Sequence, residues 1–133
     1  MTATTRAVGI GVTGVGQVEI ETSDLSRARV FYLVRLGFTL LADEADEFTF
    51  SIGNSSILVR RTDRDAAAGG DGDLPGRAHI TLVCANSDEL RRAAALLTSA
   101  GIEHSDVALD PGPGTERLTF RDPDDNGWTL CAT

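Results

Sequence analysis

The sequence predicts an α+β fold of two paired βαβββ modules, and two observations predict it. Apolar residues alternate along several short segments, which is typical of half-buried strands, and recur at helical spacing along two longer segments. The order strand, helix, strand, strand, strand then occurs twice, so that Gln17 corresponds to His79 and Gly37 to Gly101. A repeat of this kind indicates two similar modules that must share a core.

The first module opens with a strand at 17–22 that has one apolar face and one polar face. Val18 and Ile20 point to one side of this strand, whereas Glu19 and Glu21 point to the other. The apolar side can be covered by the helix that follows. The polar side is therefore expected to line a cavity.

The helix after this strand is marked at both ends. Ser23 is the expected N-cap, and the carboxylate of Asp24 suits the positive end of the helix dipole. Gly37 stands where a C′ glycine ends a helix. Between these residues the helix presents a single apolar stripe, made of Leu25, Ala28, Phe31, Tyr32 and Leu36.

Three further strands complete the first module. They are expected at 39–42, 48–52 and 56–61, and Gly53-Asn54 is the signal for a tight turn between the last two.

The second module repeats this pattern, beginning with a strand at 79–84. Asn86 or Ser87 is the expected N-cap of its helix, with Glu89 placed for a capping box, and Gly101 ends the helix. The apolar stripe of this helix consists of Leu90, Ala93, Ala94 and Leu97. A short strand region is expected at 102–109, followed by strands at 118–120 and 127–132 that are joined by a turn at 122–126.

The segments outside these elements set the domain boundaries. Residues 1–14 are mostly small and are expected to form a flexible N-terminal tail. Their GxGxxG string at 9–14 lacks the preceding strand and the following helix of a dinucleotide site. Residues 62–76 are rich in glycine and are expected to form a linker loop. The modules therefore span 15–61 and 77–133, which together make one domain.

Composition excludes several classes of function. The formal charge of −8, from 20 acidic and 12 basic residues, argues against nucleic acid and anionic membranes as partners and favours cationic ones. All the basic residues are arginines, which excludes a lysine Schiff base. Cys84 and Cys131 are expected to be free thiols in a reducing compartment. No apolar run is long enough to cross a membrane and no signal peptide is recognisable, so we expect a cytoplasmic protein.

Three stretches together resemble one family. They are SDLSRARVFYLVRLGF after the first strand, AHITL at the start of the second module, and FRDPDDNGWTL near the end. Over residues 15–133 the chain resembles the vicinal oxygen chelate superfamily, which includes glyoxalases, bleomycin resistance proteins and extradiol dioxygenases. The resemblance implies curved sheets around a cleft. It also implies a homodimer, because family members are commonly dimers in which modules of two chains complete a site.

The resemblance also implies where a metal site would lie. Members that bind a divalent ion take one ligand from each of four strands, and the matching residues are Gln17, Leu58, His79 and Thr129. The two positions that often carry glutamate in the family hold leucine and threonine here. A catalytic divalent site uses about three protein ligands, and anionic oxygens help to balance its charge. We therefore expect no metal and no other cofactor; the alternative is a divalent metal with Glu19 as a replacement ligand.

Strand alternation predicts which side chains line the cleft. The expected ligand-binding residues are Gln17, Glu19, Leu58, Arg60, His79, Thr81 and Thr129, with Glu21, Val83 and Cys131 on the same faces. The polar residues also have structural interpretations. Glu19 can pair with Arg60 across the sheet, and His79 can be a structural histidine as well as a general base or a ligand contact.

Other residues are interpreted as structural. His104 is expected to be exposed and inert, and the acidic run at 122–125 to be a turn, because it lacks the spacing of a calcium loop. Trp128 is expected in the core rather than in a stacking platform. The residues expected to pack under the helices are Val18, Ile20, Ile57, Val59, Ile80, Leu82, Trp128 and Leu130.

Three alternative functions are consistent with these predictions. The preferred one is a metal-free protein that sequesters a small aromatic or cationic natural product, as in antibiotic resistance. The second is a lyase, isomerase or dioxygenase, either metal-dependent or with Glu19 or His79 as its catalytic acid or base. The third is a structural or regulatory module whose cleft has no remaining function.

Overall fold

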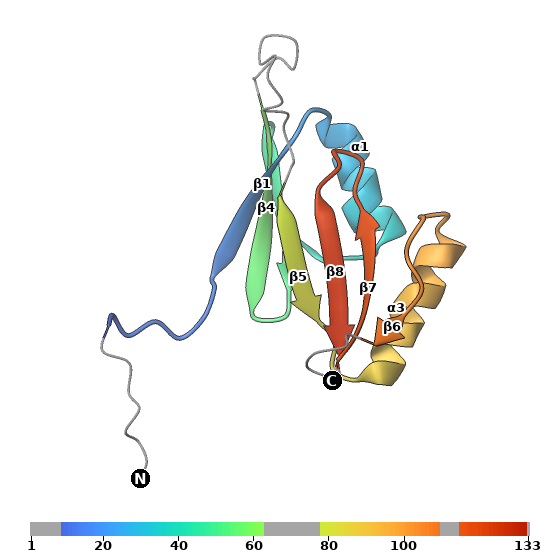
Figure 1. Cartoon of the computed structure of the whole chain (residues 1–133). Helices are drawn as coiled ribbons and strands as arrows, with labels where there is room; N and C mark the ends of the chain where they lie inside the picture. Colours follow the sequence, from blue (N-terminus) through green and yellow to red (C-terminus); the bar gives the residue numbers. More distant parts are fainter. Residues whose placement is uncertain (1–8, 63–77, 110–114, 133) are drawn as a thin grey trace, which may run out of the picture.

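Two four-stranded mixed sheets form the frame of the structure, a computed structural model that describes residues 9–62, 78–109 and 115–132 (Figure 1). The strand order is β1-β4-β3-β2 in the sheet of the first module (sheet A) and β5-β8-β7-β6 in that of the second (sheet B). The strands are β1 (Gln17–Thr22), β2 (Leu40–Asp43), β3 (Glu47–Ile52), β4 (Ser55–Arg61), β5 (His79–Val83), β6 (Ala108–Leu109), β7 (Glu116–Arg121) and β8 (Gly127–Ala132). The predicted α+β class with a doubled βαβββ order is confirmed.

The two modules have the same pairing pattern. The first strand of each module runs parallel to its last strand, with Gln17 opposite Ser56 in sheet A and His79 opposite Gly127 in sheet B. The remaining neighbours are antiparallel. The two first strands, β1 and β5, therefore each lie at an edge of their sheet.

The first helix differs from the prediction in two respects. Its N-cap is Asp24, whose carboxylate accepts from the Arg27 N–H at 3.1 Å, and not Ser23. It is an α-helix, α1, only over Leu25–Arg29 and continues as a π-helix, η2, over Val30–Arg35. The wider π turn lets the adjacent residues Phe31 and Tyr32 both enter the core, where they are 3% and 1% exposed.

The second helix, α3 (Ser87–Ser99), begins as predicted. Of the two expected N-caps, Asn86 is the one used, because its side chain accepts from the Glu89 N–H at 2.9 Å. Both helices are followed by a glycine in the left-handed region, Gly37 at φ 78° and Gly101 at φ 75°.

The strand expected at 102–109 is much shorter than predicted. Only Ala108–Leu109 forms a strand, preceded by an isolated bridge between His104 and Phe120. The His104 ring bonds to the Thr98 hydroxyl and to the Ser105 carbonyl, at 2.7 Å each. These local contacts hold the segment against the end of α3 instead of in a continuous ladder.

One core joins the two modules. Tyr32 stacks on Phe50 of sheet A at a centroid distance of 4.9 Å and meets Trp128 of sheet B at 5.8 Å. Trp128 is 1% exposed, as expected of a core residue. Of the residues predicted to pack under the helices, Ile20, Ile57, Val59 and Trp128 are buried, and Val18, Ile80, Leu82 and Leu130 are half-buried against the same core.

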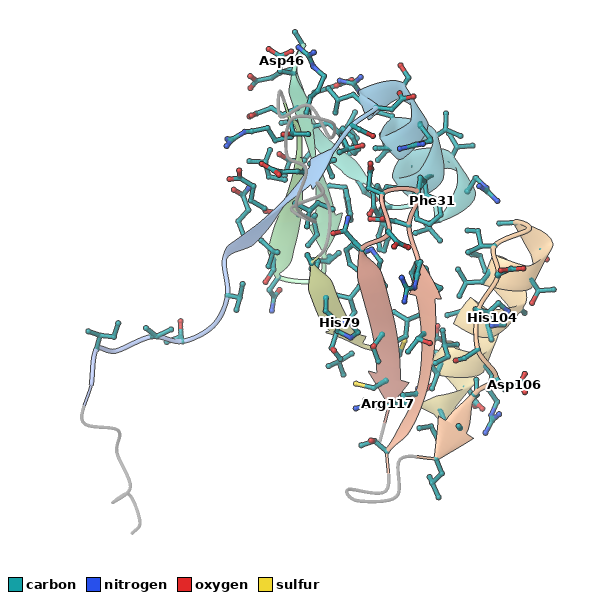
Figure 2. The ribbon with its side chains drawn as sticks, turned by 45° about the horizontal axis from the view of Figure 1, so that its top comes forward. Phe31, Asp46, His79, His104, Asp106 and Arg117 are labelled. Carbon is teal, nitrogen blue, oxygen red and sulfur yellow. The ribbon has the colours of Figure 1, made fainter. Side chains whose placement is uncertain are left out.

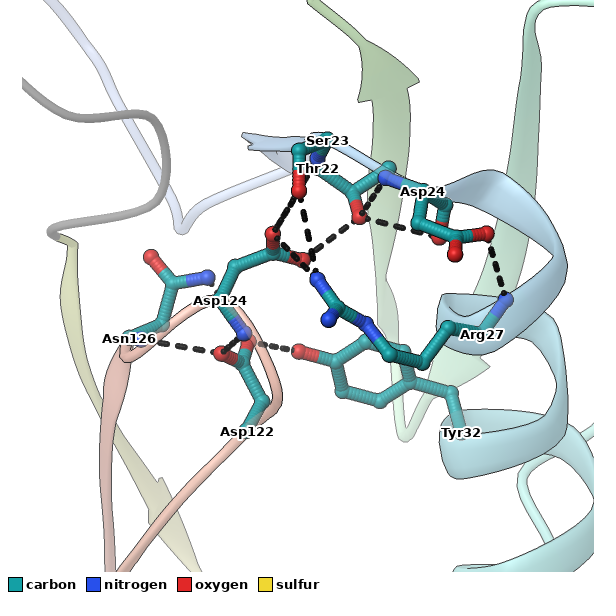
Figure 3. Close-up of polar contacts among 8 residues, drawn as sticks. All are labelled: Thr22, Ser23, Asp24, Arg27, Tyr32, Asp122, Asp124 and Asn126. Atoms are coloured by element: carbon teal, nitrogen blue, oxygen red, sulfur yellow. Dashed lines mark hydrogen bonds and ion pairs between the residues drawn. The ribbon is translucent and has the colours of Figure 1, made fainter. Parts of the chain in front are cut away.

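The turn between β7 and β8 ties the two modules together through the buried carboxylate of Asp122 (Figure 3). This carboxylate accepts from the Tyr32 hydroxyl of the first module. It also accepts from the Asn126 amide at 2.7 Å and the Trp128 indole N–H at 3.3 Å, and from the backbone N–H groups of Asp124 and Asn126. A charge that five donors satisfy is tolerated inside a protein.

A second carboxylate in the same turn holds the start of the first helix. Asp124 accepts from the Thr22 hydroxyl at 2.5 Å, from the N–H and hydroxyl of Ser23, and from Arg27 at 3.1 Å. The acidic run is therefore a turn, as predicted, and its carboxylates fasten one module to the other.

We expect the single tyrosine of the chain to resist ionisation in the folded protein. Burial, and then the neighbouring Asp122 carboxylate, raise the pKa of the Tyr32 phenol far above its ordinary value. The unfolded tyrosine ionises near pH ~10, whereas the folded one stays protonated, so stability is complete below that pH and is lost above it. The expected loss is about 1.4 kcal/mol per pH unit.

Ultraviolet titration of tyrosinate and denaturant unfolding at several alkaline pH values measure this effect. A Tyr32→Phe variant should lack the tyrosine part of the slope. A native protein whose tyrosine ionises near pH ~10 would contradict the assignment.

Two predicted segments lie mainly outside the described residues: residues 1–8 of the N-terminal tail and 63–76 of the linker. Within the described parts of the chain, no helix is long and apolar enough to cross a membrane.

Candidate functional site

The polar face of sheet A carries the predicted first-module residues. Arg60 bonds to Glu19 at 2.6 Å and to Glu47 at 3.2 Å, so the predicted cross-sheet pair is present. The Gln17 amide donates to the Ser56 hydroxyl at 3.2 Å. Leu58, which was expected to line the cleft, is only 7% exposed. Charged side chains therefore cover this face, and the apolar side chain of Leu58 lies beneath them.

The polar face of sheet B carries His79, Thr81 and Thr129. The Nε2 atom of His79 lies 3.1 Å from the hydroxyl of Thr129, which is 2% exposed. The imidazole lies against Gly127, because a Cβ atom at that residue would stand 2.7 Å from His79 Nδ1. Any larger residue at this position would force the ring to move from the orientation seen here. Thr81 is exposed.

His79 stands at the edge of a polar cavity of about 720 Å³. Among the described residues, the other charged or titratable side chains that line it are Glu103, His104 and Arg121. His79 reaches it from β5 and His104 from the segment after α3 (Figure 2). His104, which was expected to be exposed, is half-buried and lines this cavity.

The structure brings together some of the predicted site residues and leaves others apart. His79 contacts Thr129, and Glu19 contacts Arg60. The described residues that line this polar cavity, which we call the His79 cavity, all come from the second module, and neither Gln17 nor Leu58 is among them. Within one chain, the residues of the two modules therefore do not share this cavity.

The residues at the family's metal positions do not form a donor set for a catalytic divalent ion. They supply one imidazole, one amide and one hydroxyl, and Leu58 supplies no donor. His79 Nε2 is hydrogen-bonded to Thr129 at the position where a carboxylate would stand. Among the described residues, no group of three or more His, Cys, Asp or Glu side chains is placed to hold a metal ion.

A second cavity, of about 580 Å³, lies between the modules and was not predicted. Its lining comes from both modules and from the helix α3, and none of the described residues that line it is charged. We call it the apolar pocket; its walls include Val15, Val18, Leu82, Cys84, Leu96 and Phe120. The sequence feature that could have predicted this pocket is the composition of β5, in which Ile80 and Leu82 lie on one face and Val83 adds an apolar side chain to the other.

The two cysteines are free thiols in the described chain. Burial, followed by the proximity of Cys131 and Glu89, raises the pKa of the Cys84 thiol. A raised pKa lowers the thiolate fraction near neutral pH, so Cys84 is a weak nucleophile. This agrees with a structural rather than a catalytic cysteine.

Solved structures share this fold at low sequence identity. A lactoylglutathione lyase from Agrobacterium tumefaciens superimposes with a TM-score of 0.75 at 16% identity, covering 92% of this chain and 96% of the other. The fosfomycin resistance protein FosX from Listeria monocytogenes gives 0.71 at 18%, covering 92% and 94%. A glyoxalase/bleomycin resistance protein/dioxygenase from Nocardioides gives 0.73 at 21%, covering 94% and 86%.

Sequence comparison gives the family. No curated protein matches the chain. The model of the Glyoxalase/Bleomycin resistance protein/Dioxygenase superfamily matches residues 14–130, which contain both helices and both sheets except the last two residues of β8. The two βαβββ modules, their shared core and this match lead to one conclusion: the chain belongs to the glyoxalase/bleomycin resistance protein/dioxygenase superfamily.

Proposed function

We propose that the protein binds a small aromatic or cationic natural product without a catalytic metal, and so sequesters it. The observation that carries the proposal is the bond between His79 Nε2 and the Thr129 hydroxyl. At these two positions the resemblance implies a metal-binding histidine and a glutamate. Here the imidazole instead meets a neutral partner that balances no cation charge. His79 then serves to contact the ligand, with Thr129 holding its ring.

The charge of sheet A supports a cationic ligand. Among the described strand residues of this sheet, Glu19, Glu21 and Glu47 lie on one face together with the cation Arg60. Three carboxylates against one guanidinium favour the approach of cations over that of anions. Arg60 bonds to Glu19 and to Glu47, which places its guanidinium between two of these carboxylates.

We also propose a homodimer in which the cleft is completed between two copies. The matching face of sheet B carries His79 with Arg117 and Arg121, and Arg121 pairs with Asp125 at 3.0 Å. Arginine side chains on this face can meet the carboxylates on sheet A of another copy. The ligand would then lie between Arg60 and Leu58 on one side and His79 and Thr81 on the other.

The free thiols of Cys84 and Cys131 support a cytoplasmic location, where thiols are kept reduced.

Metal analysis and calorimetry test the proposal on one preparation. Protein purified without a chelator should contain zinc, nickel, iron and manganese far below one ion per chain. It should bind a probe such as bleomycin or a quinone with saturation, EDTA should leave the affinity unchanged, and the probe should be recovered intact.

Two results would overturn this function. Loss of binding when a stoichiometric metal is removed would favour a metal-dependent enzyme. Conversion of the probe to a product, abolished in His79→Ala or Glu19→Gln, would favour acid–base catalysis.

A further inference from the structure

We propose that the apolar pocket receives the N-terminal segment 9–15 of a second copy of this chain. The proposal extends the homodimer proposed above by naming a contact surface. It is independent of the ligand and of the polar faces of the two sheets. We call residues 9–15 the N-terminal arm.

The apolar side chains of the arm are largely exposed. Ile10 is 83% exposed, Val12 65% and Val15 63%. Figure 1 shows the segment leaving the start of β1 and running away from both sheets. The Val12 N–H donates to the Ile10 carbonyl at 2.9 Å within the arm, and the Val15 carbonyl accepts from the Ser55 hydroxyl where the arm meets sheet A. Adjacent exposed apolar residues of this kind typically mark a contact with another molecule.

The apolar pocket matches this arm in chemistry. Its lining includes no charged residue among those described, and the arm sequence GIGVTGV has none either. Val83, which is 79% exposed, and Leu96, which is 44% exposed, stand at the pocket. β5 beside it is an edge strand, and an edge strand can pair with an extended segment of another chain.

The neutral arm and the neutral pocket allow two copies of this acidic chain to meet at this point. The chain has a formal charge of −8, so two copies repel each other over most of their surfaces. Contact between a neutral arm and a neutral pocket avoids this repulsion and removes apolar surface from water.

The position of the arm makes a reciprocal exchange feasible. Val15 and Val18 both line the pocket, so the arm leaves the chain at the pocket itself. Seven extended residues reach about 25 Å. Two copies related by a twofold axis near this point can each place the arm in the pocket of the other, which gives a closed, self-complementary dimer.

A disulfide trap tests the contact directly, because Cys84 is a pocket residue. In a Cys131→Ser background, Val12→Cys should give a covalent dimer of twice the 14.1 kDa chain mass after mild oxidation. Leu41→Cys, at a residue 58% exposed on β2, is the matched control and should give no covalent dimer. Adding Cys84→Ser to Val12→Cys should abolish the covalent dimer.

Sedimentation of uncross-linked protein gives an independent measurement. Val12→Asp and Leu96→Asp should each weaken dimerisation by about tenfold or more, because each introduces a carboxylate into an apolar contact. Leu41→Asp should leave the dissociation constant within about twofold.

Several outcomes would overturn the proposal. One is a covalent dimer that persists without Cys84, and another is a cross-link only within one chain, which would place the arm in its own pocket. A third is a dimer unaffected by Val12→Asp and Leu96→Asp, which would leave the pocket for a small apolar molecule. In that third case the homodimer and the metal-free binding proposed above would still stand.

Discussion

Replacement of Asp122 by alanine is expected to lower the free energy of unfolding by about 3–5 kcal/mol. The variant leaves the Tyr32 hydroxyl, the Asn126 amide and the Trp128 indole N–H without their shared acceptor, and two backbone N–H groups as well. Each buried donor without a partner costs about 1–3 kcal/mol, although the turn can relax and recover part of this. Domains of this size have total stabilities of only about 5–15 kcal/mol.

Denaturant unfolding followed by tryptophan fluorescence measures this effect, because Trp128 is the only tryptophan and lies beside Asp122. The matched control is Asp46→Ala, which removes a carboxylate that is 67% exposed and paired with Arg61 at the surface. The control should cost less than about 1 kcal/mol. Equal losses in the two variants would show that Asp122 does not join the modules.

Gly127→Ala is expected to weaken binding of the probe by about tenfold or more while the protein remains folded. The new Cβ atom would lie 2.7 Å from His79 Nδ1 and 3.3 Å from its Cε1 atom, so the ring must rotate away. Rotation breaks the bond between Nε2 and the Thr129 hydroxyl. A side chain forced off its rotamer costs about 0.5–1.5 kcal/mol, a small part of total stability.

Two measurements separate this effect from general destabilisation. The chain has two histidines, so their imidazole proton resonances can be assigned with a His104→Gln variant, and Gly127→Ala should shift those of His79. Gly16→Ala is the control, because a Cβ atom there meets nothing within 4 Å. Unchanged His79 resonances with unchanged affinity would contradict the role given to this imidazole.

Much of the fold could be predicted because its signals are local. The strand β8 has the predicted bounds Gly127–Ala132, and Gly37 and Gly101 end the helical segments as expected. Alternation and helical spacing depend only on side-chain direction along one element. The choice between Ser23 and Asp24 as N-cap was not local, because Asp124 of the other module binds the Ser23 hydroxyl and leaves the cap to Asp24.

The candidate site could be predicted only in part. Strand alternation placed His79 and Thr129 on one face, and both lie there. The sequence could not show that His79 leans over Gly127 to reach Thr129, since this depends on the parallel register of β5 and β8. It also could not show that the His79 cavity excludes Gln17, since the placement of one module against the other decides which side chains meet.

The amino-acid sequence by itself determined the two βαβββ modules, the face on which each polar residue lies, and the loss of both carboxylates from the family's metal positions. Only the tertiary structure decided the π turn that buries Phe31 and Tyr32 together, the carboxylates of Asp122 and Asp124 that fasten the modules, and the apolar pocket between them. The physical reason is range: periodicity and capping act within a few residues of the chain, whereas these three features depend on atoms that meet only after the two modules have packed.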